Sequence, residues 1–276
     1  MTIEASTMSE NPVLTAIDDQ GTGWLTLNRP DVHNAFDDVL IGRMAESLSA
    51  FRDDPNVRAV VVRGAGRSFS AGADLNWMQR MGGYTFDENV EDALGLAQMI
   101  RALDELPKPT IALVQGPAYG GGVGLVAACD MAIAAAETAK FALTEVKLGL
   151  IPAVISPHVL AAIGPRQARR YFVTGEAFDA AEAYRIGLVH QVTPAADLEQ
   201  TVAGVLKELA GNGRRAMADV KDLIRAVNGR PIDHALIRDT AERIAHARAS
   251  DEGRQRITAF LEKRKAPRAK PRERTT

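Results

Sequence analysis

The sequence predicts an α/β fold with a helical C-terminal region, and three observations support this prediction. Short apolar runs of strand length alternate with segments of helical periodicity along the first part of the chain. After Pro165 the character of the sequence changes to capped helical segments. With 276 residues, the chain is long enough to bury a substantial core, as one large domain or as one domain with an appendage.

The first part of the chain alternates between two kinds of segment. We expect strands where short runs of β-branched or aliphatic residues stand beside turn residues, and helices where apolar residues recur at helical spacing. The expected helices cover residues 36–51 and 87–106, and Pro107 and Pro109 close the second. The expected strands are GWLTLNRP (23–30), VRAVVVRG (57–64), TIALVQG (110–116), MAIAAA (131–136) and KFALTEVKLGL (140–150).

The C-terminal part carries signals that start and stop helices. The segment FDAAEAYRIG (178–187) has Asp179 as N-cap, Glu182 three residues later and Gly187 past its end. Pro194 and Pro231 stand where a first helical turn would begin. Ser250 is placed to cap a last helix, which carries the apolar residues Ile257, Phe260 and Leu261.

These signals divide the chain into four parts and reveal no fixed-period repeat. We expect a disordered N-terminus at residues 1–12, a core at 13–190, a helical region at 191–264 and a basic disordered tail at 265–276. The final KRKAPRAKPRERTT is proline-containing and almost free of large apolar groups. We therefore interpret it as a solvated end rather than as an arm that binds nucleic acid.

The composition excludes several classes of protein. Apolar residues make up 46% and charged residues 25%, and the net charge of −2 gives no reason to expect nucleic acid or a membrane as partner. The single cysteine, Cys129, excludes an internal disulfide and a multi-cysteine zinc site, and we expect no metal. The N-terminal residues lack the apolar core of a signal peptide, and no run approaches a membrane span of about 18 apolar residues. We expect a cytoplasmic protein.

The segment GPAYGGGVGLVAACD (116–130) places five glycines in nine positions ahead of an apolar, alanine-rich stretch. Glycine at this density has an entropic cost, so the fold must need bare backbone there. Three interpretations compete: a dinucleotide-binding turn, glycines that only let a helix pack tightly on a sheet, and a helix N-terminus whose N–H groups stabilise an anion.

The dinucleotide interpretation rests on Gly122 to Ala127, which match G-x-G-x-x-A, with Glu145 about 20 residues later. The geometry argues against it, because the first glycine should follow the strand directly. Here seven residues separate Val114 from Gly122, and Glu145 lies beyond the expected second strand, MAIAAA. The segment taken alone leaves the other two interpretations open.

A second glycine turn favours the anion-stabilising interpretation. GRSFSAGADLNWM (66–78) also follows an expected strand, and its Ser-Ala-Gly-Ala run again exposes backbone N–H groups. Two such turns can direct one N–H each at the same oxygen, which is how an enzyme holds an enolate or a tetrahedral oxyanion without side-chain donors.

The sequence resembles the crotonase (enoyl-CoA hydratase/isomerase) superfamily over nearly its whole length. Each matching piece is weak alone, but their order and spacing are highly specific. The pieces are the opening from Leu27 to Ala35, FSAGADL, KPTIALVQGPAYGGGVGL, ACD, FALTEVKLGLIP and FDAAEAYRIGLVHQV. The resemblance implies a spiral of β-β-α units with a C-terminal helical region that builds trimers or dimers of trimers. The substrate would be an acyl-CoA, with no separate cofactor.

The resemblance also implies roles for individual residues. The backbone N–H groups of Ala73 and Gly121 would bind the thioester oxygen, and Glu145 would be the catalytic acid and base. We expect His33 to be a binding-loop residue rather than a catalyst. The expected contacts to substrate and coenzyme A are Val32, His33, Ala71, Gly72, Asp74, Leu75, Gly120 and Thr144.

Gly124 departs from the family pattern. Hydratases of this family commonly use two glutamates, and the first of these positions is Gly124 here, whereas Glu145 occupies the second. A carboxyl desolvated beside an acyl chain should have a raised pKa and exchange protons near neutral pH. A single carboxylate suits hydration, if it activates water and returns the same proton to Cα, and it also suits isomerisation. A non-catalytic acyl-CoA-binding relative is the competing class.

A closer resemblance favours hydration. GGGVGLVAACD together with LTEVKLGLIPAVISPHV and FSAGADLNWMQRM looks like the bacterial branch that hydrates methylglutaconyl-CoA in leucine catabolism, or its relative for carboxygeranoyl-CoA. The resemblance implies that a glycine at position 124 is usual in that branch. The distal carboxylate of such a substrate would need a cation, for which Lys147 and Arg80 are the candidates, although a surface role suits both better.

Overall fold

The computed structural model describes residues 11–265, and the chain divides after Ala210 into two compact units. Most of the expected disordered N-terminus and nearly all of the basic tail lie outside the described residues. Asn11 and Pro12 are tied to the first hairpin, since the backbone N–H of Asn28 donates to the Pro12 carbonyl at 2.8 Å.

The first unit is built on a six-stranded sheet in the order β1-β2-β3-β4-β6-β9, and a small three-stranded sheet, β5-β7-β8, stands apart from it. In the large sheet only β1 is antiparallel to its neighbour. Its strands are β1 (Val13–Ile17), β2 (Thr22–Leu27), β3 (Ala59–Gly64), β4 (Thr110–Val114), β6 (Met131–Ala135) and β9 (Gln191–Thr193). The small sheet consists of β5 (Ala118–Tyr119), β7 (Lys140–Ala142) and β8 (Phe178–Asp179).

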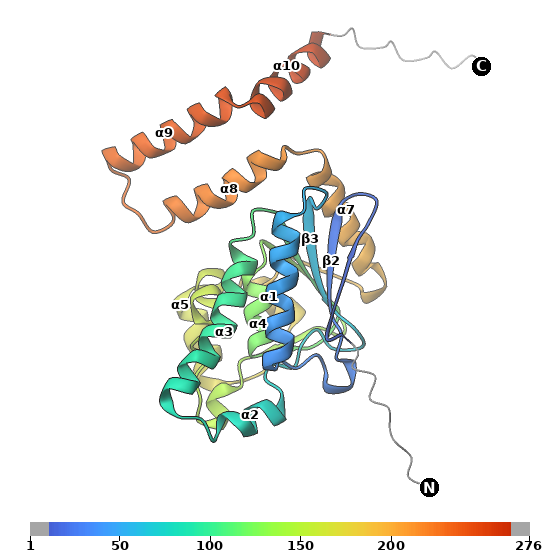
Figure 1. Cartoon of the computed structure of the whole chain (residues 1–276), viewed down its shortest axis with the longest axis vertical. Coiled ribbons are helices and arrows are strands. Elements are labelled where there is room, and N and C mark those ends of the chain that lie inside the picture. Colours follow the sequence, from blue (N-terminus) through green and yellow to red (C-terminus); the bar gives the residue numbers. More distant parts are fainter. Residues whose placement is uncertain (1–10, 266–276) are drawn as a thin grey trace, which may run out of the picture. The chain divides into compact units, whose positions relative to one another are not determined.

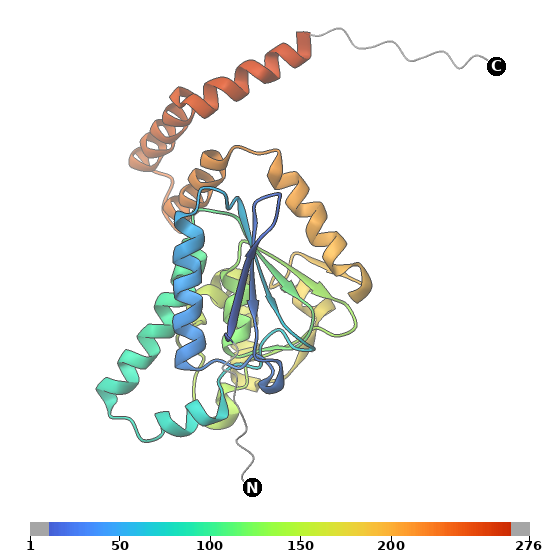
Figure 2. The ribbon, with the colours of Figure 1, turned by 45° about the vertical axis from the view of Figure 1, so that its right-hand side comes forward.

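Helices cover both faces of the large sheet, which explains why its strands read as continuous apolar runs (Figures 1 and 2). Val60 and Val62 of β3 face a core that is shared with α1 (Asp38–Asp53), α3 (Phe86–Asp104) and α4 (Gly121–Ala128). Val61 points the other way, into a smaller core under α7 (Leu198–Ala210). This alternation is the period of two that a strand imposes on its side chains.

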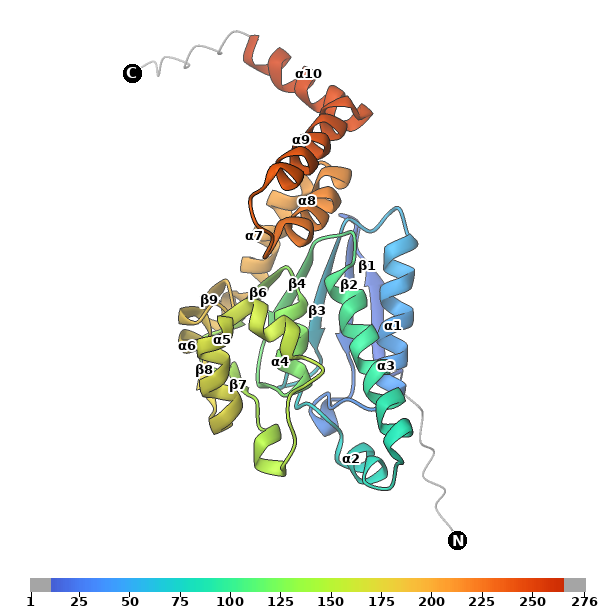
Figure 3. The same ribbon diagram turned by 90° about the vertical axis from the view of Figure 1, so that its left-hand side faces the viewer.

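The remaining elements of the first unit lie around this sheet (Figure 3). They are α2 (Leu75–Met81), α5 (Ser156–Thr174), α6 (Ala180–Arg185) and the short 3₁₀ turns η1 (Pro30–Val32), η2 (Glu145–Leu148) and η3 (Ala195–Asp197). A non-helical residue, Gly164 (φ 72°, ψ 162°), breaks α5 into two helices just before Pro165. The helical character therefore begins at Ser156, somewhat earlier than Pro165.

The second unit contains α8 (Arg214–Val227), α9 (His234–Ala249) and α10 (Asp251–Lys265). Ser250 caps α10 as expected, because its Oγ accepts the Gly253 N–H at 3.0 Å. The cap of α9 is Asp233, whose carboxylate accepts the Leu236 N–H at 2.8 Å. Pro231 thus stands ahead of the helix and not in its first turn.

Two expected boundaries differ from the structure. The strand expected at 140–150 ends at Ala142, because the backbone turns at Thr144 (φ −89°, ψ 3°) and Glu145 begins η2. The core extends past residue 190, because β9 pairs with β6 as the last strand of the large sheet and α7 buries Leu198 and Val202 against it.

At 178–187 the structure has the expected N-cap, with Asp179 accepting the Glu182 N–H at 2.9 Å, and Gly187 adopts φ 89°. The Glu182 carboxylate bonds to Tyr171 and Arg185.

Candidate active site

Two glycine-containing turns meet at one edge of the large sheet. The first turn follows β3 and the second follows β4, and these two strands are parallel neighbours. Because parallel strands end at the same edge, both turns lie where α/β sheets form their ligand sites. The isolated bridge between Ser70 and Ala118 joins them, with the Tyr119 N–H donating to the Ser70 carbonyl at 2.8 Å.

The two turns contact each other through two glycines with positive φ. Gly72 adopts φ 86°, and a Cβ there would lie 3.0 Å from the Tyr119 carbonyl oxygen and 3.7 Å from the Gly120 Cα. Gly120 adopts φ 49°, and a Cβ there would lie 3.9 Å from the Gly72 Cα. Positive φ favours glycine at both positions, and at Gly72 the close approach of the Tyr119 carbonyl adds a second reason.

The backbone N–H groups of Ala73 and Gly121 stand free beside this contact. Within residues 11–265, no acceptor is found for either group. Gly121 is the first residue of α4, whose N-terminus carries a partial positive charge. Ala73 is exposed and Gly121 is half-buried, so both groups lie at the surface of the turns. Each group is a backbone donor that is available to a negatively charged oxygen.

Glu145 places a carboxylate at this contact. Its Oε1 lies 3.0 Å from the point where a Cβ on Gly120 would stand. Its other oxygen, Oε2, is buried and has no hydrogen-bond partner among the described residues. Desolvation by burial raises the pKa of Glu145 above its usual value, and the hydrogen bond from its own backbone N–H offsets this only in part. Thr144, the residue before it, is half-buried.

The segment from Val32 to Ala35 holds the first turn in place. The Ala71 N–H donates to the His33 carbonyl at 2.9 Å, and Asn34 donates from its buried side chain to the Ser68 carbonyl at 2.8 Å. His33 and Asn34 both adopt φ 55°. The His33 ring contacts Ser68 Oγ at 3.0 Å, and Val32 is 40% exposed. The geometry agrees with His33 as a residue of a loop rather than of the carboxylate site.

Asp74 caps α2 directly after the first turn. Its Oδ1 accepts the N–H groups of Asn76 and Trp77 at 2.8 and 3.3 Å, and its Oδ2 pairs with Arg29 at 3.0 Å. Burial raises the pKa of Asp74, but the two N–H donors and Arg29 outweigh it and lower the pKa overall. Leu75, the next residue, is 81% exposed.

Position 124 is filled by another part of the chain. Gly124 is buried in α4, and a Cβ there would lie 2.3 Å from Ile155 Cγ2 and 2.8 Å from Ile155 Cβ. Ile155 is 3% exposed and precedes α5. The sequence motif identified Gly124 as a missing acid but gave no signal for Ile155.

The two candidate cations, Arg80 and Lys147, contact other residues at the surface. Arg80 pairs with Asp38 at 2.5 Å on the surface. Lys147 is exposed, and its Cε lies 3.1 Å from the point where a Cβ on Gly175 would stand, at the end of α5. The expected surface role therefore suits both side chains.

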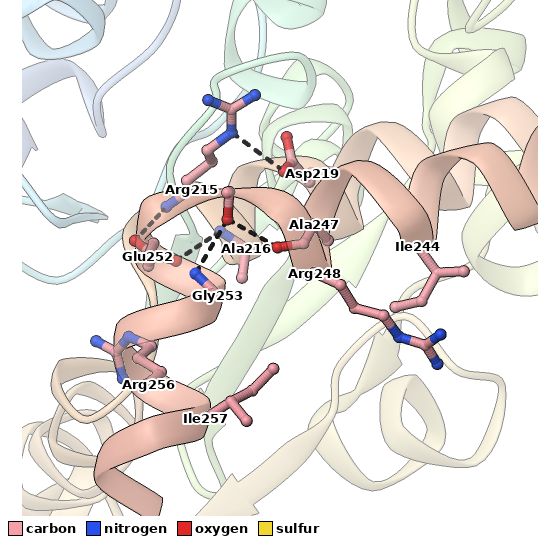
Figure 4. Close-up of a pocket in the computed structure, with 11 residues that line it drawn as sticks. Arg215, Ala216, Asp219, Ile244, Ala247, Arg248, Glu252, Gly253, Arg256 and Ile257 are labelled. Carbon is pink, nitrogen blue, oxygen red and sulfur yellow. Dashed lines mark hydrogen bonds and ion pairs between the residues drawn. The ribbon is translucent and has the colours of Figure 1, made fainter.

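A separate cavity lies within the second unit, between α8, α9 and α10 (Figure 4). Its polar groups serve the helices themselves. Glu252 accepts the N–H groups of Arg215 and Ala216 and so caps α8, whereas Arg256 donates to the carbonyls of Gly211 and Asn212. No group of three or more metal-binding side chains occurs among the described residues, and none of the described helices combines the length and apolarity of a membrane span.

Comparison with known proteins decides the family. Residues 18–270 match the enoyl-CoA hydratase/isomerase family model. The chain belongs to this family. It is therefore an enzyme of the crotonase superfamily, and its sequence is similar to a crotonyl-CoA hydratase of Syntrophomonas wolfei, with 34% identity over 244 residues that cover 88% of this chain and 92% of the relative.

Solved structures of the family share the fold. An enoyl-CoA hydratase from Shewanella pealeana superimposes with a TM-score of 0.88 at 42% identity, over 91% of this chain and 94% of that one. Pseudomonas aeruginosa AtuE gives a TM-score of 0.87 at 36% identity, over 91% and 97%. The expected crotonase fold with a helical C-terminal region is confirmed.

Proposed function

We propose that this family member hydrates the α,β double bond of an enoyl-CoA thioester. One observation carries the proposal: the half-buried carboxylate of Glu145, whose Oε2 is buried and has no hydrogen-bond partner among the described residues, lies against the turn that begins α4, where the N–H groups of Gly121 and of Ala73 in the adjoining turn are unbonded. A base and an anion site in the same region suit a reaction that moves a proton at a carbon next to a carbonyl.

In the proposed reaction, the N–H groups of Ala73 and Gly121 donate to the thioester oxygen. Glu145 takes a proton from water while the water oxygen bonds to the β-carbon, and the electrons of the double bond move onto the thioester as an enolate. The protonated Glu145 then returns the proton to the α-carbon. The raised pKa of Glu145 favours both transfers, because it brings the carboxyl nearer to neutral pH.

Coenzyme A enters this scheme as part of the substrate, with no separate cofactor. The segment around Val32, His33 and Ala71 is the proposed contact for its adenine and pantetheine parts, and Gly72, Asp74, Leu75, Gly120 and Thr144 complete the proposed binding set. The positive φ of His33 and the hydrogen bond from Ala71 to its carbonyl supply the fixed backbone that such a contact needs.

The narrower proposal is 3-methylglutaconyl-CoA, an intermediate of leucine catabolism, or a carboxygeranoyl-CoA. It rests on the sequence motifs around Gly124 and Glu145. Isomerisation is the second candidate reaction, because one carboxylate is enough to move a proton between two carbons of an enoyl chain.

We propose that copies of the chain associate through the second unit, as a trimer or a dimer of trimers in the cytoplasm. Large apolar side chains stand exposed on its helices, including Ile224 at 59%, Ile237 at 54% and Phe260 at 60%. Exposed apolar side chains at this density favour burial against another protein surface.

The proposal is tested by measuring turnover of a series of unsaturated acyl-CoAs that includes crotonyl-CoA and 3-methylglutaconyl-CoA. Product analysis separates a 3-hydroxyacyl-CoA, expected from hydration, from a shifted double bond, expected from isomerisation. Tight acyl-CoA binding with no product from any member of the series would favour the non-catalytic relative.

A further inference from the structure

We infer that Ile155 determines the single-carboxylate character of the site by occupying the space that a side chain at position 124 would need. The inference rests on the proposed function for its chemical meaning, but its steric part stands on geometry alone. The buried Ile155 puts Cγ2 2.3 Å and Cβ 2.8 Å from the Cβ position of residue 124, and Ile100 Cδ1 follows at 3.4 Å.

The blocked position lies near the start of α4, where Glu145 contacts the helix. The Gly124 N–H donates to the Gly120 carbonyl at 3.2 Å, so these two glycines stand one helical turn apart. Glu145 Oε1 lies 3.0 Å from the Cβ position of Gly120, so the blocked position is one turn of α4 away from the residue that adjoins this carboxylate.

Ile155 cannot move aside as the end of a long side chain could. Its Cβ is bonded directly to the backbone at the start of α5, and the residue is surrounded by the main core. The aliphatic side chain of Ile155, at the start of α5, therefore occupies the space that a side chain at position 124 of α4 would fill. Glu145 is therefore left to act without a second ionisable group from position 124 of α4.

The steric part is tested by a cycle of thermal unfolding measurements on full-length variants. Gly124→Ala should lower the Tm by about 3–10 °C, the usual cost of overpacking a core. Ile155→Gly will itself lower the Tm. The loss in Tm of the double variant G124A/I155G should nevertheless be smaller than the sum of the losses in the two single variants. G124A/I155A should recover less, because alanine retains the Cβ at 2.8 Å.

The matched control is Gly42→Ala in α1, where an added Cβ meets nothing within 4 Å. This variant should melt at or slightly above the wild-type temperature, since alanine is the better helix former. Additive effects of G124A and I155G would overturn the inference that Ile155 occupies the space beside Gly124.

The chemical part is tested in the background of Glu145→Gln. Adding G124E and I155G should raise turnover at least about 10-fold over E145Q/I155G, because a carboxylate placed near the reacting carbons contributes proton transfer. Unchanged turnover in a triple variant that still melts cooperatively would overturn the inference that this space faces the reaction. Wild-type protein that turns over no enoyl-CoA would contradict the proposed function and leave the unfolding cycle valid.

Discussion

The carboxylate of Glu145 lies against the bare backbone of Gly120: a Cβ on Gly120 would stand 3.0 Å from Glu145 Oε1 and 3.9 Å from the Gly72 Cα. Three segments from different parts of the chain thus meet at one point. Each depends on the others, because a shift of either turn would move the free N–H groups relative to the carboxylate.

Gly120→Ala should abolish most activity while the protein still folds. The methyl group would press on Glu145 Oε1, and φ 49° is unfavourable for alanine. We expect kcat/KM to fall at least about 10²-fold, since small misplacements of catalytic groups have effects of that size. Gly229→Ala is the control, because Gly229 also has a positive φ (71°) but meets nothing within 4 Å. Similar losses of activity in both variants would contradict the steric explanation.

Glu145→Gln should leave acyl-CoA binding intact and remove turnover. Glutamine keeps the size of the side chain but has no basicity, so kcat should fall at least about 10²-fold, the typical contribution of a positioned proton-transfer group. The comparison variant is Glu46→Gln, whose side chain is 67% exposed on α1. Near-normal turnover of Glu145→Gln would show that another group performs the chemistry.

The raised pKa of Glu145 predicts opposite pH effects on activity and stability. Activity that needs the ionised carboxylate should fall as the pH drops through a value above the usual 4.5. Stability behaves differently, because the folded state holds this proton more tightly than the unfolded chain does, and so loses stability as the pH rises.

The Tm of Glu145→Gln relative to wild type should therefore increase as the pH rises above the usual Glu pKa of 4.5 and through the raised pKa of the folded protein. Thermal melts of both proteins across this range measure the difference. A Tm difference that stays constant with pH would mean that burial does not raise the pKa of Glu145.

Local patterns in the sequence predicted the features that depend on nearby residues. Periodicity and capping predicted strands at 57–64 and 110–116, a helix at 36–51 and an N-cap at Asp179. The structure has β3 at Ala59–Gly64, β4 at Thr110–Val114, α1 at Asp38–Asp53 and the cap at Asp179. The motif likewise indicated Glu145. The short strand before Glu145 was overestimated, because a run of apolar residues does not reveal where the backbone turns.

The features that were missed depend on contacts between distant segments. Nothing near Ile155 indicates that it fills the space beside Gly124, and nothing near Asn34 indicates that its amide holds the Ser68 carbonyl of the first turn. Gln115 is a similar case, since its Nε2 donates to the same Ser68 carbonyl at 2.8 Å. A single sequence records which residues are present, but the pairing of such residues arises only when the sheet brings its loops together.

Asp74 links the first glycine turn to two helices. Arg29 pairs with Asp74 and with Asp37 at 3.0 Å each, so one guanidinium joins the N-caps of α1 and α2. Asp74→Ala should lower stability by about 2–4 kcal/mol, because it removes a helix cap and leaves Arg29 with one partner fewer. Asp74→Asn should lose less, since asparagine is also a good N-cap.

The pH dependence of stability distinguishes the contribution of the Asp74 charge from that of its N-cap hydrogen bonds. The lowered pKa of Asp74 stabilises the folded protein above the usual Asp pKa of 3.8, and this stabilisation is lost as the pH falls through the lowered value. The difference in unfolding free energy between wild type and Asp74→Asn should therefore shrink in strong acid, as denaturant titrations at several pH values would measure. Asp53→Asn, at an exposed position in the last turn of α1, serves as the control.

Asp74→Ala should also reduce kcat/KM, because Ala73 directly precedes this cap and its N–H is one of the two proposed donors. Full activity in that variant would argue against a role of Asp74 in holding the first turn.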